Sequence, residues 1–169
     1  RTLALVADLL GLQTGWVWLL DPATDQFYLA AVQNLPPYLR EPVRMSGRWC
    51  LCTDLFRQRA LTPTNIDMLE CTRLRPAVEE DAADATLGLR YHASLPLSFG
   101  ERLLGIINVA GPEWRELSPD ELGLLATIAY QAGIAVERAR LAEASNRLAR
   151  IEERTRIARE IHDTLAQGL

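Results

Sequence analysis

The chain has 169 residues, of which 49% are apolar and 24% are charged, and its formal net charge is -4. It is long enough to bury a sizeable core in one domain with an appendage. The acidic balance excludes a general attraction to nucleic acid or anionic membranes, and no apolar run approaches the roughly 18 residues of a spanning helix. We therefore expect a cytoplasmic, globular protein.

The two ends of the sequence look cut from a longer protein. The first residue is Arg1 rather than Met, and it lies within an apolar-periodic stretch that lacks the cleavage site of a signal peptide. The last run contains one of only two histidines. We therefore expect a fragment. Its three cysteines, an odd number in a cytoplasmic context, argue against a disulfide framework, so reduced thiols are the default.

The first third of the chain predicts a helix and a hairpin. Residues 3–10 have helical spacing, and Gly11 is a plausible stop. Residues 15–20 and 27–32 are β-branched and aromatic runs, and the turn sequence of residues 21–25 lies between them. The pattern predicts a short helix followed by two paired strands.

The middle, residues 34–90, has no sustained periodicity. Prolines, a glycine and an acidic cluster interrupt short apolar pieces. Such a long irregular segment in a compact domain is usually functional or mobile. Strand character returns at residues 93–97 and 103–109, and Gly100 and Glu101 form the turn between them. This is a second predicted hairpin.

The sequence from Ser118 onward predicts a long helix. Ser118 can cap the helix, Pro119 fits the first helical position, and Glu121 completes a capping box. No proline follows, so the helix can run for about fifty residues, or roughly 75 Å. Its first part should pack on the sheet through apolar residues spaced three or four apart, which are Leu122, Leu125, Ile128, Ala132 and Val136.

The rest of this helix needs another partner. Two series with a spacing of seven indicate a coiled-coil seam, and their members are Leu141, Leu148, Thr155, His162 and Leu169, and Ala144, Ile151, Ala158 and Leu165. A straight helix would instead bury Ile157 and Ile161. A four-helix bundle, which needs a wider apolar face, reconciles both patterns. A parallel homodimer is the expected assembly.

The order of these elements predicts an α+β fold with a central antiparallel sheet flanked by helices. Residues 95–97, residues 105–109 and the run L-S-P-D-E-L-G-L-L-A-T-I-A-Y-Q-A-G-I-A-V-E-R-A-R-L resemble the second half of a GAF domain. The resemblance covers residues 1–141 and implies a sensory module that holds a small molecule or cofactor between its sheet and its irregular middle. Residues 142–169 then form a signalling helix.

The final run, E-R-T-R-I-A-R-E-I-H-D-T-L-A-Q-G-L, resembles the phosphoacceptor helix of sensor histidine kinases typified by nitrate sensors. The resemblance implies that His162 is phosphorylated and that Asp163 is the neighbouring acid-base residue. It also implies that Gln167 orients water to dephosphorylate a response regulator, and Glu160 helps to position the pair. An imidazole attacks the γ-phosphate of ATP through a neutral nitrogen, so a neighbouring carboxylate suits the chemistry. A solvated histidine is the plain alternative for an isolated His-Asp pair.

The implied kinase would need a second helix and an ATP-binding domain, neither of which is in this sequence. There is no phosphate-cradling glycine loop either. We therefore expect the parent protein to be an ATP-dependent protein-histidine kinase, and residues 142–169 to be the truncated start of its dimerisation domain. This fragment should be inactive alone.

All three cysteines fall in the irregular middle. In an extended segment Cys50 and Cys52 would point the same way, and Cys71 and His92 would complete four soft ligands. That set suits tetrahedral zinc or an iron-sulfur cluster, with redox or gas sensing as its use. The alternatives are three buried free cysteines with no metal, haem held by His92, or a diffusible ligand.

Two functions therefore remain open at the level of sequence. The first is a regulatory fragment of a two-component sensor histidine kinase, in which the GAF domain controls autophosphorylation of His162 and phosphotransfer to a response regulator. The alternative is a stand-alone GAF module that binds a small molecule or only dimerises, without a metal.

Overall fold

The computed structural model describes residues 11–40, 50–80, 83–111 and 115–167, without the side chains of residues 78, 83 and 163–167. The predicted helix at residues 3–10 lies outside the described residues. The chain divides into two compact units, Arg1–Gly133 and Ile134–Leu169, and each is described by itself. No helix in the described ranges combines the length and the hydrophobicity that crossing a bilayer requires.

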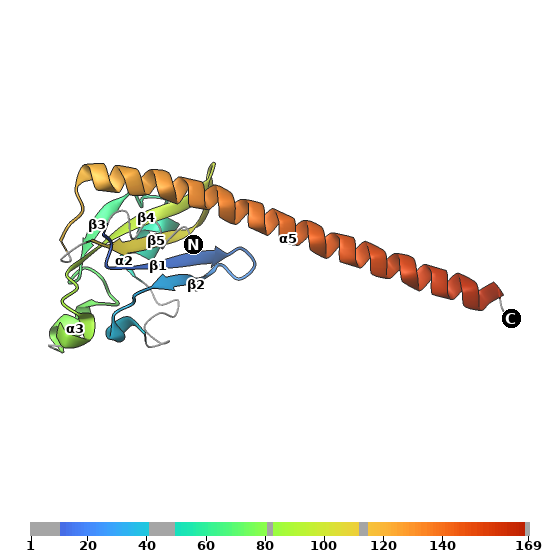
Figure 1. Ribbon diagram of the computed structural model, residues 1–169, viewed down its shortest axis with the longest axis horizontal. Helices are drawn as coiled ribbons and strands as arrows, with labels where there is room; N and C mark the ends of the chain where they lie inside the picture. The colour runs from blue at the N-terminus through green and yellow to red at the C-terminus, as the bar shows by residue number, and fades with distance from the viewer. Residues whose placement is uncertain (1–10, 41–49, 81–82, 112–114, 168–169) are drawn as a thin grey trace. The chain divides into compact units, whose positions relative to one another are not determined.

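A five-stranded antiparallel sheet forms the centre of the first unit (Figure 1). Its strands, in chain order, are β1 Thr14–Asp21, β2 Gln26–Gln33, β3 Thr64–Asp67, β4 Tyr91–Phe99 and β5 Arg102–Ala110. Their order across the sheet is β2-β1-β5-β4-β3. The predicted α+β class with a central antiparallel sheet is confirmed.

Both predicted hairpins are present. In the first turn, the Ala23 amide donates a hydrogen bond to a carboxylate oxygen of Asp21 at 2.8 Å, and Asp25 adopts a φ of 54°. In the second, Gly100 has a φ of 58°. Left-handed backbone is common for Gly and tolerated by Asp, which explains why the turn residues were readable from the sequence.

The irregular middle folds into short elements, η1 Pro37–Leu39, α2 Leu51–Arg57, β3, α3 Arg75–Glu79 and α4 Ala83–Thr86. The expectation that Cys50 and Cys52 share an extended segment is wrong. Cys50 is the N-cap of α2 and Cys52 lies in its first turn. Strand β3 was not predicted, because four residues with mixed burial carry no clear period.

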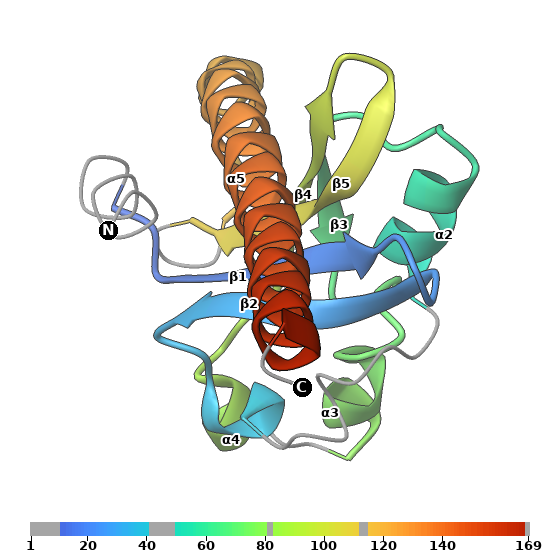
Figure 2. The same cartoon turned by 90° about the vertical axis from the view of Figure 1, so that its right-hand side faces the viewer.

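Helix α5 spans Pro119–Gln167, 49 residues, close to the length expected from the sequence. The predicted capping box is present, since the Glu121 amide donates to Ser118 Oγ at 3.3 Å and the Ser118 amide donates to Glu121 Oε2 at 2.8 Å. Within the first unit, α5 lies across one face of the sheet (Figure 2). Leu125, Ala129 and Gly133 are its buried positions there.

The opposite face of the sheet carries the larger core, under the short helices of the middle. Trp16 and Trp18 of β1 and Ile106 of β5 pack there with Phe56 of α2 and all three cysteines. Because successive strand residues alternate between faces, the neighbours of Ile106 and Trp18 point toward α5 instead. The space under the middle segment is thus filled by side chains.

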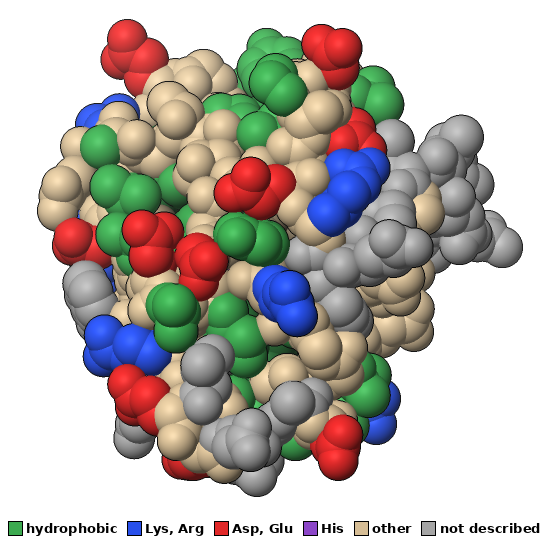
Figure 3. All heavy atoms as spheres, turned by 90° about the vertical axis from the view of Figure 1, so that its left-hand side faces the viewer, with side chains coloured by type: hydrophobic (Ala, Val, Ile, Leu, Met, Phe, Trp, Pro, Cys, Tyr) green, Lys and Arg blue, Asp and Glu red, His purple; other side chains and the backbone are tan. Residues whose placement is uncertain are grey.

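The surface shows no concentration of one charge on the face drawn in Figure 3, where acidic and basic side chains are interspersed with apolar ones. This agrees with the small net charge of -4.

Helix α5 approaches the sheet closely at Gly133. A Cβ at this position would lie 2.1 Å from the carbonyl oxygen of Ser98, at a point where the β4–β5 register shifts between Leu97 and Ser98. A backbone atom cannot move aside as a flexible side chain can, so any larger residue at position 133 pushes the helix off the strand.

We predict that Gly133→Ala destabilises the domain by about 2 kcal/mol or more, because the added methyl group overlaps the Ser98 carbonyl. Gly123→Ala in the same helix is the matched control. A Cβ at Gly123 meets nothing within 4 Å, so this change should stabilise by up to about 1 kcal/mol through helix propensity. Urea unfolding followed by circular dichroism measures both, and equal effects would contradict the packing argument.

Candidate functional site

The first part of the candidate site is the start of α2. The Cys50 amide donates to Thr53 Oγ1 at 3.0 Å, and the same hydroxyl donates to the Cys50 carbonyl at 2.8 Å. Thr53 therefore fixes the backbone of the N-cap, as a reciprocal cap does. This holds the side chains of Cys50 and Cys52 against the core.

The second part is the turn that follows β3. The Cys71 amide donates to the Asp67 carbonyl at 3.0 Å, and the Cys71 carbonyl accepts from the amides of Leu74 and Arg75 at 2.9 and 2.8 Å. Cys71 is thereby fixed between β3 and α3, a segment separate from α2.

These two segments bring the three sulfurs together. Cys52 Sγ lies 3.6 Å and Cys71 Sγ lies 3.8 Å from Cys50 Sγ. Each residue is at most 2% exposed. We call Cys50, Cys52 and Cys71 the thiol cluster, with Cys50 as its common member.

The contacts within the cluster change the acidity of its thiols. Hydrogen bonds from the Cys52 and Cys71 thiols lower the pKa of the Cys50 thiol well below its ordinary value. Those same bonds, with burial, raise the pKa of the Cys52 and Cys71 thiols. The cluster therefore favours one negative charge, carried by Cys50.

His92 of β4 lies on the same face of the sheet, where its ring contacts Trp16 with centroids 5.3 Å apart. Ser94 Oγ donates to Asn108 Oδ1 at 2.7 Å, so its 3.3 Å contact with His92 Nδ1 is accepted from an Nδ1–H. The Nε2 lone pair is then buried without a hydrogen-bond partner among the described residues.

The charge state of His92 follows from its surroundings. Burial lowers the pKa of its imidazole to about 4, so the ring is neutral near pH 7. The charge on Cys50 opposes this shift in pKa and is close enough to act on the ring. A neutral imidazole with an open Nε2 therefore stands near the thiol cluster.

Arg73 is a charged side chain in this core that the sequence did not single out. It is 8% exposed, and its guanidinium lies 4.6 Å from the ring centroid of Trp18. Cation–π contact stabilises a desolvated guanidinium. Its positive charge also acts to lower the pKa of the Cys52 thiol, against the larger effects of the Cys50 contact and burial.

The expected metal ligands are thus brought near one another, but not around a single centre. Two thiolates on one tetrahedral zinc lie about 3.8 Å apart, because the Zn–S bond is about 2.3 Å. Both sulfur–sulfur distances from Cys50 are close to this value. Yet among the described residues no group of three or more His, Cys, Asp or Glu side chains is arranged to hold a metal ion. A metal bound by all three thiols needs at least one side chain to move.

The phosphoacceptor candidates lie near the end of α5. His162 is exposed, and the Glu160 carboxylate forms an ion pair with Arg156, which also binds Glu153 at 2.7 Å. Asp163 and Gln167 belong to the helix, but their side chains lie outside the described part of the chain. Their roles remain predictions.

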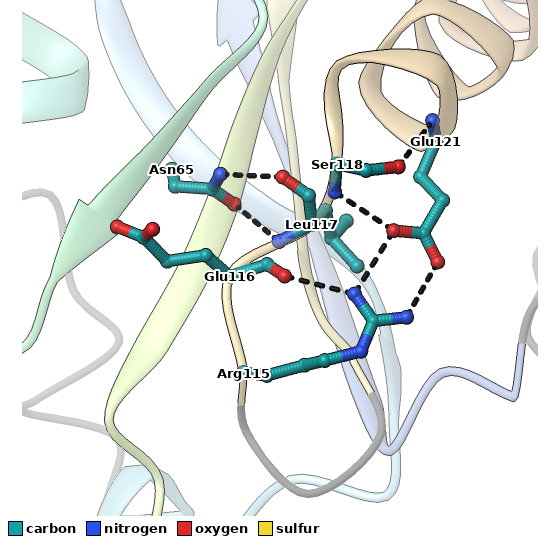
Figure 4. A network of polar contacts seen from close by, with 6 residues as sticks. All are labelled: Asn65, Arg115, Glu116, Leu117, Ser118 and Glu121. Atoms are coloured by element: carbon teal, nitrogen blue, oxygen red, sulfur yellow. Dashed lines mark hydrogen bonds and ion pairs between the residues drawn. The ribbon is translucent and has the colours of Figure 1, made fainter.

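The start of α5 is tied to β3 by the network in Figure 4. The Asn65 side chain accepts from the Leu117 amide at 3.0 Å and donates to the Leu117 carbonyl at 2.8 Å. Arg115 forms a two-pronged ion pair with Glu121, at 2.9 and 2.7 Å. Strand β3 therefore connects the turn that carries Cys71 to the first turn of α5.

The comparisons with known proteins agree with this architecture. Residues 1–137 match the GAF domain family. The chain belongs to that family. Residues 153–169 match the histidine kinase family. The prediction of a GAF domain followed by the start of a nitrate-sensor-type phosphoacceptor helix is confirmed.

This chain is similar in sequence to a sensor histidine kinase and similar in fold to solved GAF domain structures. Sensor histidine kinase YhcY of Bacillus subtilis (strain 168) is 36% identical over 164 residues, which cover 96% of this chain but 42% of that protein. The chain therefore spans less than half of this relative. A GAF domain/HD domain protein from Geobacter sulfurreducens has a TM-score of 0.62 at 16% identity, covering 83% of this chain and 90% of that one. The second GAF domain of DevS from Mycobacterium smegmatis has a TM-score of 0.57 at 19% identity, covering 87% of this chain and 94% of that one.

Several polar residues of the GAF core were missed at the level of sequence. Ser94 and Asn108 were detectable in principle, because each is a polar residue with apolar residues on both sides in its strand. Arg73 and Asn65 offered no such signal. Their roles depend on contacts with residues far away in the chain.

We predict a pH-dependent contribution from Glu121. Its hydrogen bonds with Arg115 and the Ser118 amide lower its pKa from 4.5 to about 2. The stabilisation is therefore complete above pH 4.5 and is lost as the pH falls toward 2. Urea unfolding of Glu121→Gln should show a deficit at pH 6 that shrinks below pH 4. Glu116→Gln is the control, since its carboxylate makes no drawn contact in Figure 4, and an equal deficit there would contradict the prediction.

Proposed function

We propose that the chain is the regulatory part of a cytoplasmic two-component sensor histidine kinase, in which the state of the GAF domain controls phosphorylation of His162. The observation that carries the proposal is the continuity of α5. This single helix begins at the capping box on the GAF sheet and runs through the residues that match the histidine kinase family. A stand-alone module would have no need of that second match.

In this proposal each residue of the final motif has a chemical role. The neutral imidazole of His162 attacks the γ-phosphate of ATP bound by a catalytic domain of the kinase, and Asp163 accepts the proton from the other ring nitrogen. Gln167 orients the water that dephosphorylates the response regulator. Glu160 forms an ion pair with Arg156 one turn away, which holds its carboxylate on the helix surface.

A homodimer through α5 is part of the proposal. Five large apolar side chains of the second unit are between 42% and 62% exposed, and they are Leu141, Leu148, Ile151, Ile157 and Ile161. A long helix with an uncovered apolar stripe gains stability by packing against a second copy. The match to the histidine kinase family supports the same assembly.

We predict that ATP-dependent labelling of the full-length protein disappears in His162→Gln, because glutamine offers no nucleophilic ring nitrogen. Asn146→Ala is the control, since Asn146 is exposed on the same helix outside the motif. Radiolabel transfer from ATP measures both variants. Undiminished labelling of His162→Gln would contradict the role of this residue.

A second candidate function is redox or gas sensing through a metal bound by the thiol cluster and His92. It is supported by two sulfur–sulfur distances close to that of two thiolates on one zinc ion. The Nε2 of His92, which has no hydrogen-bond partner among the described residues, also supports it. Zinc or an iron-sulfur cluster suits such ligands. When bound, an iron-sulfur cluster would supply reversible electron transfer, and Cys50, Cys52, Cys71 and His92 would hold it. Haem on His92 is the remaining cofactor alternative.

We predict that protein purified without oxygen contains bound metal, and that Cys50→Ser and Cys52→Ser each abolish it. Met68→Leu is the control, because Met68 is a buried sulfur-containing residue of the same core outside the proposed ligand set. Absorption spectra with metal analysis measure the content. Metal that is unchanged in the cysteine variants, or absent from the wild type, would end this second candidate.

A further inference from the structure

The thiol cluster contains a pair of cysteines that are in contact but belong to different segments. Cys50 caps α2, and Cys71 lies 21 residues further on in the turn between β3 and α3. Their sulfurs are 3.8 Å apart. A disulfide bond is about 2.05 Å long, so each sulfur has to move by roughly 1 Å to form one.

Cys52 is the poorer partner for Cys50 despite its shorter contact of 3.6 Å. Cys50 is the N-cap of α2 and Cys52 lies in its first turn, so only one residue separates them. A bond between Cys50 and Cys52 would therefore disrupt the start of the helix. Cys71 approaches from outside α2, so a bond to Cys50 leaves the helix backbone in place.

We propose that Cys50 and Cys71 form a reversible disulfide when the metal-free protein meets a small uncharged oxidant such as hydrogen peroxide. This inference goes beyond the proposed kinase function and does not depend on it. It assigns a site of covalent modification to residues that the sequence alone favoured as reduced thiols or metal ligands.

The reaction balances in two steps. The Cys50 sulfur attacks one oxygen of hydrogen peroxide and the O–O bond breaks. The departing hydroxide leaves as water, with its proton taken from the Cys50 thiol or, when Cys50 is ionised, from solvent. Cys50 is then a sulfenic acid, oxidised by two electrons. The Cys71 sulfur attacks the Cys50 sulfur, the S–O bond breaks, and the Cys71 proton leaves with the hydroxide as a second water.

Burial restricts which reagents can reach the site. Cys50 and Cys71 are each 1% exposed, so a bulky or charged thiol reagent should not label them in the folded protein. A neutral molecule about the size of water can enter during small openings of the core. Reaction with hydrogen peroxide but not with a bulky or charged thiol reagent is therefore the expected behaviour of this site.

The disulfide would also link two segments of the domain covalently. It would join the start of α2 to the turn that leaves β3, and β3 holds the start of α5 through Asn65. Oxidation would thus act on the segment that anchors α5 within the first unit.

The test uses this chain after anaerobic treatment with a chelator, with its metal content confirmed as nil. Hydrogen peroxide should remove two hydrogen atoms per chain, and proteolytic mapping should place the bond between the Cys50 and Cys71 peptides. Dithiothreitol should reverse it, and the charged disulfide reagent DTNB should leave the folded protein unlabelled. A chain without a mass change, or a bond found only after denaturation, would overturn the proposal.

Two matched variants sharpen the outcome. Cys52→Ser should retain the bond, whereas Cys71→Ser should lose it and accumulate a sulfenic acid on Cys50, detected as the mass of one added oxygen atom. Equal loss in both variants, or a Cys50–Cys52 bond in the wild type, would contradict the assignment. Because mapping of the wild type needs no substitution, a variant that fails to fold leaves the test intact. Metal analysis of untreated protein is separate, so failure of the metal candidate and failure of this inference are distinguishable.

Discussion

The register between β4 and β5 is the constraint on which the rest of the domain depends. Ser94 is paired directly with Asn108 across these two strands, and their side chains are hydrogen bonded at 2.7 Å. Because strand residues alternate between faces, this pairing sends the polar residues and His92 toward the thiol cluster. It also turns the apolar neighbours, Leu95 and Ile107 among them, toward α5. A shift of the β4–β5 register by one residue would place polar side chains under α5. It would also remove the Ser94–Asn108 hydrogen bond from the face of the thiol cluster.

Local signals in the sequence predicted the elements that are stabilised locally. The capping box at Ser118 and Glu121 needs only neighbouring residues, and so do the turns at Asp21 and Gly100. The N-cap at Cys50 was missed, because cysteine is not a usual capping residue and the reciprocal hydroxyl comes from Thr53. The spacing of Cys52 and Phe56, four residues apart and both buried, was the signal that indicates a helix there.

The candidate site was predictable in membership but not in geometry. Cysteine and histidine are few in this sequence, so their chemistry drew notice at once. The four expected metal ligands, Cys50, Cys52, Cys71 and His92, all lie in the core under the middle segment or beside it. The tautomer of His92 follows instead from Ser94 and Asn108, and the acidity of Cys50 follows from which thiols contact it. Both depend on side-chain contacts between segments brought together by folding, which no spacing rule contains. For the same reason, Asn65 and Arg73 could not be found.

The path from this core to α5 is short within the first unit. Cys71 is fixed by a hydrogen bond to Asp67 at the end of β3, and Asn65 of the same strand makes two hydrogen bonds to Leu117. The capping box follows Leu117 directly, and Gly133 of the same helix packs closely against Ser98. A change at the thiol cluster that shifts β3 must therefore either break these contacts or carry the first turn of α5 with it. Under the proposed function, either result would act on α5, the helix that bears His162.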